Sequence, residues 1–145
     1  MATVAPPARS RALAVRPAIH WLALLALCGA YLQGALVKLV DFPGAMAEMA
    51  HFGLAPAGPI AVLVILLELG ASAMILSGVL RWLGALALAV FTLLATFLAF
   101  RFWEFVPPER MMVANGFFEH LGLVGGFVLV AWHDLREPPG HGDRL

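Results

Sequence analysis

The strongest constraint on the fold is an apolar run over residues 59–80 that a single carboxylate, Glu68, interrupts. At about 1.5 Å per residue in a helix the run measures roughly 33 Å, enough to cross a hydrocarbon core of about 30 Å. The run therefore predicts a membrane-spanning helix. Glu68 lies roughly 13 Å from the start of that helix at the same rise. A charge at that depth is costly without a partner or a proton, so we expect Glu68 to face another polar group.

The composition is that of an integral membrane protein. Hydrophobic residues make up 62% of the 145 residues, charged residues make up 12%, and the mean hydropathy is +0.92. These values lie far outside those of soluble domains. The length leaves room for one compact bundle without a separate soluble domain. The formal net charge of zero gives no electrostatic basis for binding nucleic acid, and we expect none.

Three further apolar runs complete a set of four predicted spans. The four spans cover residues 18–37, 59–80, 82–100 and 113–132. The first run is longer than the roughly 7 to 15 residues of a signal-peptide core, so we expect an uncleaved span. Helix start signals at Asp41 and Pro43 predict a short interfacial helix over residues 43–51. The sequence thus predicts an all-α fold, an integral membrane four-helix bundle.

Basic residues predict the orientation of this bundle, because cytoplasmic loops are enriched in Lys and Arg. An even number of spans places both termini on one side. That side carries six basic residues, namely Arg9, Arg11, Arg16, Arg81, Arg136 and Arg144; the other side carries three, namely Lys38, Arg101 and Arg110. We therefore expect both termini in the cytoplasm and the short helix in a periplasmic loop. Polar tails without regular structure are expected over residues 1–17 and 133–145, around a membrane domain at 18–132.

Six polar residues are predicted to lie in the outer half of the bundle. They are Gln33, Lys38, Glu68, Arg101, Glu119 and His120. Counting about 1.5 Å per residue places Lys38 and Arg101 at the outer boundary, above the two acids. Long cationic side chains can reach inward to buried acids. This predicts the ion pairs Lys38 with Glu68 and Arg101 with Glu119.

The function of these pairs stays open on the sequence alone. They can be structural pairs that fix helix register, or they can line a ligand pocket that opens to the outer leaflet; proton-coupled transport is a third, weaker reading. Asn115 and Glu119 share a helical stripe with Gly122 and Gly126, which lack side chains and so let another backbone approach. We therefore expect Glu119 to face protein.

The remaining chemistry-bearing residues form no complete site. His20 and His133 are both expected at the cytoplasmic end, where a bis-histidine haem is conceivable but no second signal supports it. Cys28 is the single cysteine, which excludes an internal disulfide or a thiolate metal site within one chain. We expect it to pack as a small hydrophobe. No metal site and no resident cofactor are predicted, and the catalytic residues, if any, are unknown.

Five segments combine into a recognisable pattern: GALVKLVDFPG, LLELGAS, GVLRWLGALALA, FRFW and GFFEHLGLVGG. Together they resemble the DoxX family of small bacterial four-helix membrane proteins, over nearly all of residues 18–132. The resemblance implies that Lys38 and Glu68 are the basic and acidic membrane residues of the family. The chain departs from the pattern at Arg101, where members often carry His, and at Glu119 and His120, where Lys-Asn is common.

Family membership would imply a multi-pass protein of the bacterial inner membrane. Members are linked to quinone-coupled sulfur oxidation and to membrane complexes that manage oxidative stress, beside a partner that carries the redox chemistry. We therefore expect an accessory or ligand-binding subunit in contact with membrane lipids and with other subunits or a second copy of itself. The alternative is a quinone-linked oxidoreductase subunit that holds a quinone near Glu68, Glu119 and His120.

Overall fold

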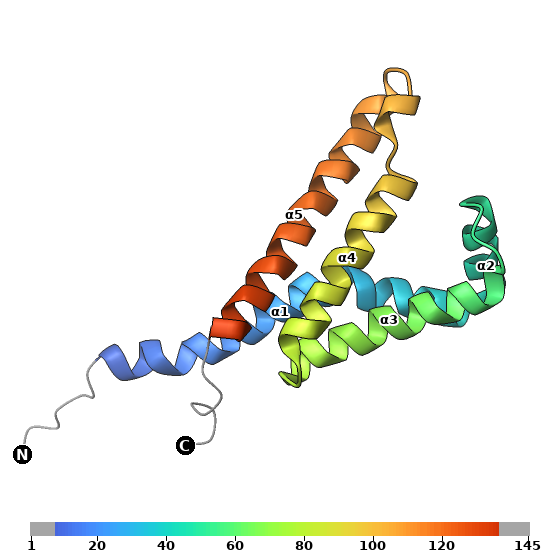
Figure 1. Ribbon diagram of the computed structural model, residues 1–145. Coiled ribbons are helices and arrows are strands. Elements are labelled where there is room, and N and C mark those ends of the chain that lie inside the picture. The colour runs from blue at the N-terminus through green and yellow to red at the C-terminus, as the bar shows by residue number, and fades with distance from the viewer. Residues whose placement is uncertain (1–7, 137–145) are drawn as a thin grey trace, which may run out of the picture.

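The computed structural model describes residues 8–136, with side chains over residues 17–136, and all regular elements in that range are helices. Four helices are long and apolar enough to cross a membrane: α1 (Ala8–Val40), α3 (Ala57–Ser77), α4 (Arg81–Ala99) and α5 (Glu109–Arg136). The short helix α2 (Phe42–His51) joins α1 to α3, and the 3-10 helix η1 (Phe102–Glu104) lies between α4 and α5 (Figure 1). The expected all-α fold with four spans is confirmed.

The first and last helices are longer than the sequence predicts. α1 begins at Ala8, so residues 8–17, expected in an irregular tail, are helical. Ala and Arg have high helix propensity, and extending a helix that is already nucleated costs little. α5 likewise continues to Arg136, past its expected end at residue 132. The rest of the two predicted tails lies outside the described residues.

A tight turn joins α3 to α4, and a side chain of α5 holds it in place. Gly78 ends α3 with a φ of 82°, a left-handed conformation that favours glycine. Arg81 donates through Nε to the carbonyl oxygen of Ile75 at 2.9 Å and lies 3.6 Å from the Asp134 carboxylate. The other Asp134 oxygen accepts the backbone N–H of Trp82 at 3.0 Å, which satisfies a donor in the first turn of α4.

The four spans pack tightly at the end of the molecule where α5 ends and α3 turns into α4, which we call the closed end. Each span contributes a fully buried side chain to the core there: Cys28 from α1, Ile75 from α3, Leu88 from α4 and Phe127 from α5. Small residues lie where α4 meets its neighbours at this end, because Gly84, Ala85 and Ala89 are buried. Close helix contact therefore holds this end together.

Gly84 marks the closest approach of α3 and α4. A Cβ atom at this position would lie 2.7 Å from the carbonyl oxygen of Ala71 and 2.9 Å from the Cβ of Met74. Real Cβ atoms do not approach backbone so closely. Only glycine therefore fits at this crossing.

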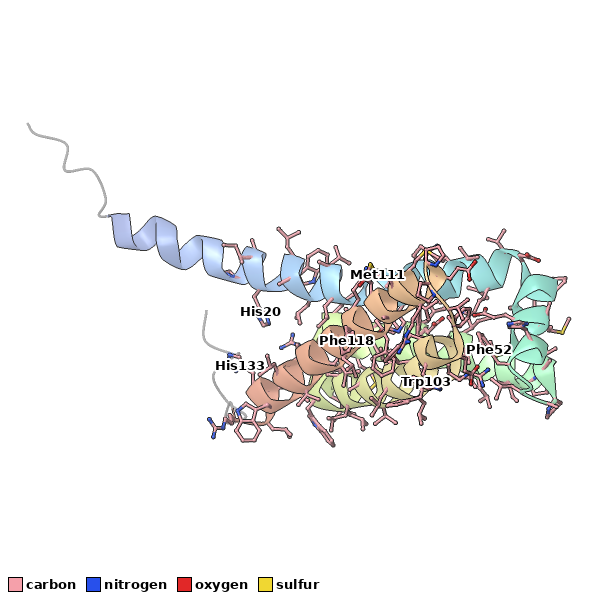
Figure 2. The ribbon with its side chains drawn as sticks, turned by 90° about the horizontal axis from the view of Figure 1, so that it is seen from above. His20, Phe52, Trp103, Met111, Phe118 and His133 are labelled. Carbon is pink, nitrogen blue, oxygen red and sulfur yellow. The ribbon has the colours of Figure 1, made fainter. Side chains whose placement is uncertain are left out.

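The helices separate at the opposite end, which carries α2 and η1 and which we call the open end. Figure 1 shows α4 and α5 running together toward η1, away from the direction in which α1 and α3 run toward α2. In Figure 2, His20 and His133 mark the closed end, and Phe52 and Trp103 lie toward the open end. The helix pairs α1/α3 and α4/α5 are thus joined at one end and diverge at the other.

Candidate functional site

A cavity of about 520 Å³ lies between the two helix pairs at the open end. All five α-helices line it, and most of its walls are apolar, with side chains such as Val64, Phe91, Leu98 and Leu123. The volume falls within the range of roughly 300 to 1,000 Å³ that is typical of small-molecule sites. The divergence of the helix pairs therefore leaves a space of the size and character of a ligand pocket.

An ion pair between α1 and α3 lines this cavity. Lys38 Nζ lies 3.4 Å from each carboxylate oxygen of Glu68, and the two side chains are only 13% and 7% exposed. Gly34, one turn before Lys38, makes room for the pair, since a Cβ there would lie 3.4 Å from Nζ and 3.6 Å from Oε1. The distances exceed the 2.7 to 2.9 Å of a short charge-assisted hydrogen bond. Lys38 therefore retains capacity to donate to another acceptor.

A chain of hydroxyl groups forms the polar part of the facing wall. The hydroxyls of Tyr31 and Thr92 are hydrogen-bonded, and Thr92 donates to the carbonyl oxygen of Leu88 at 2.6 Å. Because a threonine hydroxyl carries one hydrogen, Tyr31 must be the donor to Thr92. This hydrogen bond joins α1 to α4 at the floor of the cavity, and edge-on packing of Tyr31 against Phe91 and Phe127 fixes the ring.

His120 brings α5 into the cavity wall. Its Nδ1 lies 3.1 Å from Thr96 Oγ1, and its ring packs edge-on against Phe100 with centroids 4.5 Å apart. The Thr96 hydroxyl donates its hydrogen to the carbonyl oxygen of Thr92 at 2.6 Å, so it accepts from Nδ1. In the neutral imidazole this assignment leaves Nε2 as a hydrogen-bond acceptor.

The charges that line the cavity do not favour an anion. Lys38 supplies one positive charge, and Glu48 and Glu68 supply two negative charges. Glu48 comes from α2 and is exposed, so it lies where solvent reaches the cavity. With His120 neutral, the formal sum is one negative charge, which suits an uncharged or zwitterionic ligand better than an anionic one.

Three of the six predicted polar residues line the cavity, namely Lys38, Glu68 and His120, and the structure forms the predicted Lys38–Glu68 pair. The other three do not line it. Gln33 is exposed on α1. The prediction therefore succeeded for the polar residues whose helix faces are turned toward the space between the two helix pairs.

The predicted pair of Arg101 with Glu119 is wrong. Arg101 follows the end of α4, and its Nη1 instead lies 3.1 Å from Oε1 of Glu104, three residues further along the chain. Glu119 is exposed on α5, so it does not pack against the described helices of its own chain. Counting residues gave the depth of each group but not the direction in which its helix face points.

Three polar residues that line the cavity were not singled out in the sequence as site residues, namely Tyr31, Glu48 and Thr92; neither was Thr96, which contacts His120. A signal existed for Tyr31, because it precedes Lys38 by seven residues and Gly34 by three, which places all three on one helix face. Glu48 had no such signal, since its position depends on how α2 folds back.

A second, smaller cavity of about 270 Å³ lies between α1 and α5 at the other end of the molecule. His20, Arg81, His133 and Asp134 contribute to its lining, and Figure 2 shows the two histidines near each other at that end. Within residues 17–136 no three His, Cys, Asp or Glu side chains gather closely enough to hold a metal ion.

The fold and cavity define a class, a four-span membrane protein with a largely apolar cavity near one end that carries a few polar groups. A family model described as DoxX matches residues 21–101, which is more than half of the chain. The protein therefore belongs to the DoxX family. The matched range contains Lys38 and Glu68, whereas α5 with Glu119 and His120 lies beyond it. No curated protein and no solved structure matches the chain.

Proposed function

We propose that the protein binds an uncharged, lipid-soluble amphiphile in the open-end cavity and acts as an accessory subunit of a membrane complex. One observation carries this proposal: a cavity of about 520 Å³ with apolar walls holds the Lys38–Glu68 pair and His120 inside a membrane domain. Apolar walls take the tail or ring of a ligand, and a few polar groups orient its head.

The head group would lie against Lys38. Its ammonium group is held 3.4 Å from Glu68 and can donate to a ligand oxygen without losing its counter-charge. The net negative lining disfavours free fatty acids and acidic phospholipids, which would place a third negative charge beside Glu48 and Glu68. An uncharged ligand with carbonyl or hydroxyl groups meets both conditions.

A quinone is the second candidate, and the position of His120 favours it. A quinone ring carries oxygens on opposite edges, and the cavity offers a donor on α1, Lys38, and an imidazole on α5, His120. The free Nε2 of neutral His120 is an acceptor, so it suits the hydroxyl of a reduced quinol. Electron transfer would then need a partner subunit with a redox centre, and this chain would supply the quinone site.

Mass spectrometry of the protein in native lipid discs tests the proposal. Ala95 of α4 lines the cavity, so the indole of Ala95→Trp should fill it. Val90 of α4 is 57% exposed, so Val90→Trp places the same indole on the outer surface and serves as the control. A bound amphiphile should accompany the wild type and Val90→Trp but not Ala95→Trp. Retention by Ala95→Trp, or no amphiphile in the wild type, would contradict the proposal. The mass of the extracted ligand distinguishes a quinone from a lipid.

We also propose that the chain lies in the bacterial inner membrane with the closed end facing the cytoplasm. The excess of Lys and Arg on the side of the chain termini supports this orientation. In a Cys28→Ser background, an impermeant thiol reagent added to intact cells should label Ala47→Cys in α2 but not Ser77→Cys at the α3–α4 turn. Labelling of Ser77→Cys alone would reverse the orientation.

A further inference from the structure

Glu119 is a carboxylate at membrane depth that has no ion-pair or hydrogen-bond partner among residues 17–136. It lies ten residues after Glu109, the first residue of α5, and seventeen before Arg136, the last. At about 1.5 Å per residue, those ends are roughly 15 Å and 25 Å away. The side chain is exposed and forms no ion pair or hydrogen bond with any residue over the range 17–136. Ionisable groups in spans normally face protein or a water-filled cavity.

The helix that carries Glu119 is the least covered of the spans. Three of the 28 side chains of α5 are buried, namely Phe117, Phe127 and Ala131. By comparison, α3 buries six side chains along 21 residues. The exposed face of α5 toward the open end carries Asn115, Phe118, Glu119 and Gly122, which we call the α5 outer face.

The α5 outer face carries both a hydrogen-bond donor and an acceptor. Asn115 and Glu119 lie one turn apart on the same stripe. The Asn115 amide donates, the Glu119 carboxylate accepts, and both side chains are exposed. Near Gly122, one turn further, no other described helix comes within 4 Å of where a Cβ would stand, so another backbone can approach there.

We propose that the α5 outer face binds a second copy of this chain, related by a two-fold axis along the membrane normal. In such a pair each Asn115 donates to Glu119 of the partner subunit, and the axis generates the same contact twice. Helical side chains lean toward the N-terminus, and the Glu119 side chain is one carbon longer than that of Asn115, so its carboxylate can reach toward the level of the partner's Asn115. The occupant is a second copy because this one face contains both halves of the contact. This inference is independent of the proposed ligand.

Disulfide crosslinking in native membranes tests the position of the interface. In a Cys28→Ser background, Gly122→Cys lies on the α5 outer face, whereas Val128→Cys lies about 120° around the same helix at 100° per residue. Val128 is 46% exposed, so its thiol is accessible too. Mild oxidation should give a band of twice the chain mass for Gly122→Cys and little or none for Val128→Cys. Equal crosslinking of both, or of neither, would overturn the proposal.

The dimer dissociation constant of the purified protein tests the contact itself. Glu119→Leu should weaken dimerisation about tenfold or more, because two interhelical hydrogen bonds are lost. The double variant Asn115→Leu with Glu119→Leu should dimerise no more weakly than Glu119→Leu alone, since both changes remove the same contact. The helix content of each variant, measured by circular dichroism, should match that of the wild type, which excludes misfolding as the cause. An unchanged or tighter dimer, a monomeric wild type, or crosslinks to a different protein only would each contradict the proposal.

Discussion

The closed and open ends of the bundle use small and polar residues in opposite ways. At the closed end, Gly84 brings α4 against the backbone of α3, and fully buried side chains such as Phe127 fill the remaining space. At the open end, Gly34 makes room for the charged groups of Lys38 and Glu68 beside a cavity. The comparison indicates that helix contact supplies the stability at one end, while the other end keeps polar groups accessible.

The difference has a physical origin in the membrane. Lipid tails are as apolar as leucine, so helices gain little from hydrophobic burial and associate through close packing and hydrogen bonds. The closed end has both, since Asp134 also bonds to the first turn of α4. Once α3 and α4 are fixed there, the open end can diverge without unfolding the bundle.

Gly84→Val should have the largest effect, because it acts on the closed end. The added Cβ would meet the Ala71 carbonyl oxygen at 2.7 Å, and backbone cannot move aside as a side chain can. We expect a loss of roughly 3 kcal/mol in the free energy of unfolding, at the upper end for overpacking. Unfolding by SDS in mixed micelles measures it.

Gly70→Val is the matched control for this change. Gly70 is exposed on the same pair of helices and has no neighbour within 4 Å of a Cβ. Its replacement should leave the free energy of unfolding within about 1 kcal/mol of the wild type. Equal losses for the two variants would show that close contact at Gly84 does not hold the closed end together.

Lys38→Met should have the next largest effect, at the open end. It leaves the Glu68 carboxylate without a counter-charge, whereas Glu68→Gln leaves an ammonium group near the end of α1 that can reach the boundary. We expect a loss of roughly 2 kcal/mol for Lys38→Met, below the 3 to 5 typical of fully buried pairs because the cavity admits water. Glu68→Gln should lose less in the same SDS titration.

The double change Lys38→Met with Glu68→Leu distinguishes a pair from two separate groups. Replacing both charges by apolar side chains removes the stranded acid, so most of the stability lost by Lys38→Met should return. Losses that simply add would show that the two residues do not act as partners. Recovered stability with loss of the bound amphiphile would assign the pair to the binding site.

Thr96→Val should have the smallest effect. It removes the hydroxyl that accepts from His120 Nδ1 at 3.1 Å, while the shape of the side chain is kept. Interhelical hydrogen bonds in membranes contribute about 0.6 kcal/mol on average, so we expect a loss of that size. Thr96→Ser keeps the hydroxyl and should behave as the wild type. A large loss in Thr96→Val would mean that the open end depends on hydrogen bonds as the closed end depends on packing.

The sequence predicted the elements well because each apolar run has the length of a span. It also predicted the Lys38–Glu68 pair, because a deep acid requires a partner and Lys38 has the right depth. The helical face of Glu119 could not be predicted this way. Its stripe with Gly122 and Gly126 indicated a packed face, but α1 contacts that stripe only at Gly126, where a Cβ would lie 3.2 Å from Leu27.

The sequence predicted the depth of the polar groups at the cavity but not the shape of the cavity. Depth along a helix follows from counting residues, but the divergence of α4/α5 from α1/α3 depends on how the closed end fixes the crossing of α3 and α4. Arg101 illustrates the limit. Helix α4 ends at Ala99, before Arg101, and η1 brings the Glu104 carboxylate within 3.1 Å of the Arg101 guanidinium. This local ion pair replaces the expected pair of Arg101 with Glu119.

The most direct test of the difference between the two ends compares two thiols in detergent after lipid extraction. Native Cys28 is fully buried in the closed end, and Ala95→Cys, in a Cys28→Ser background, places a thiol on the wall of the open-end cavity. A small water-soluble thiol reagent should modify Cys28 only through local unfolding, so the Ala95→Cys thiol should react roughly a hundredfold faster. Similar rates at the two positions would contradict a bundle that is packed at one end and hollow at the other.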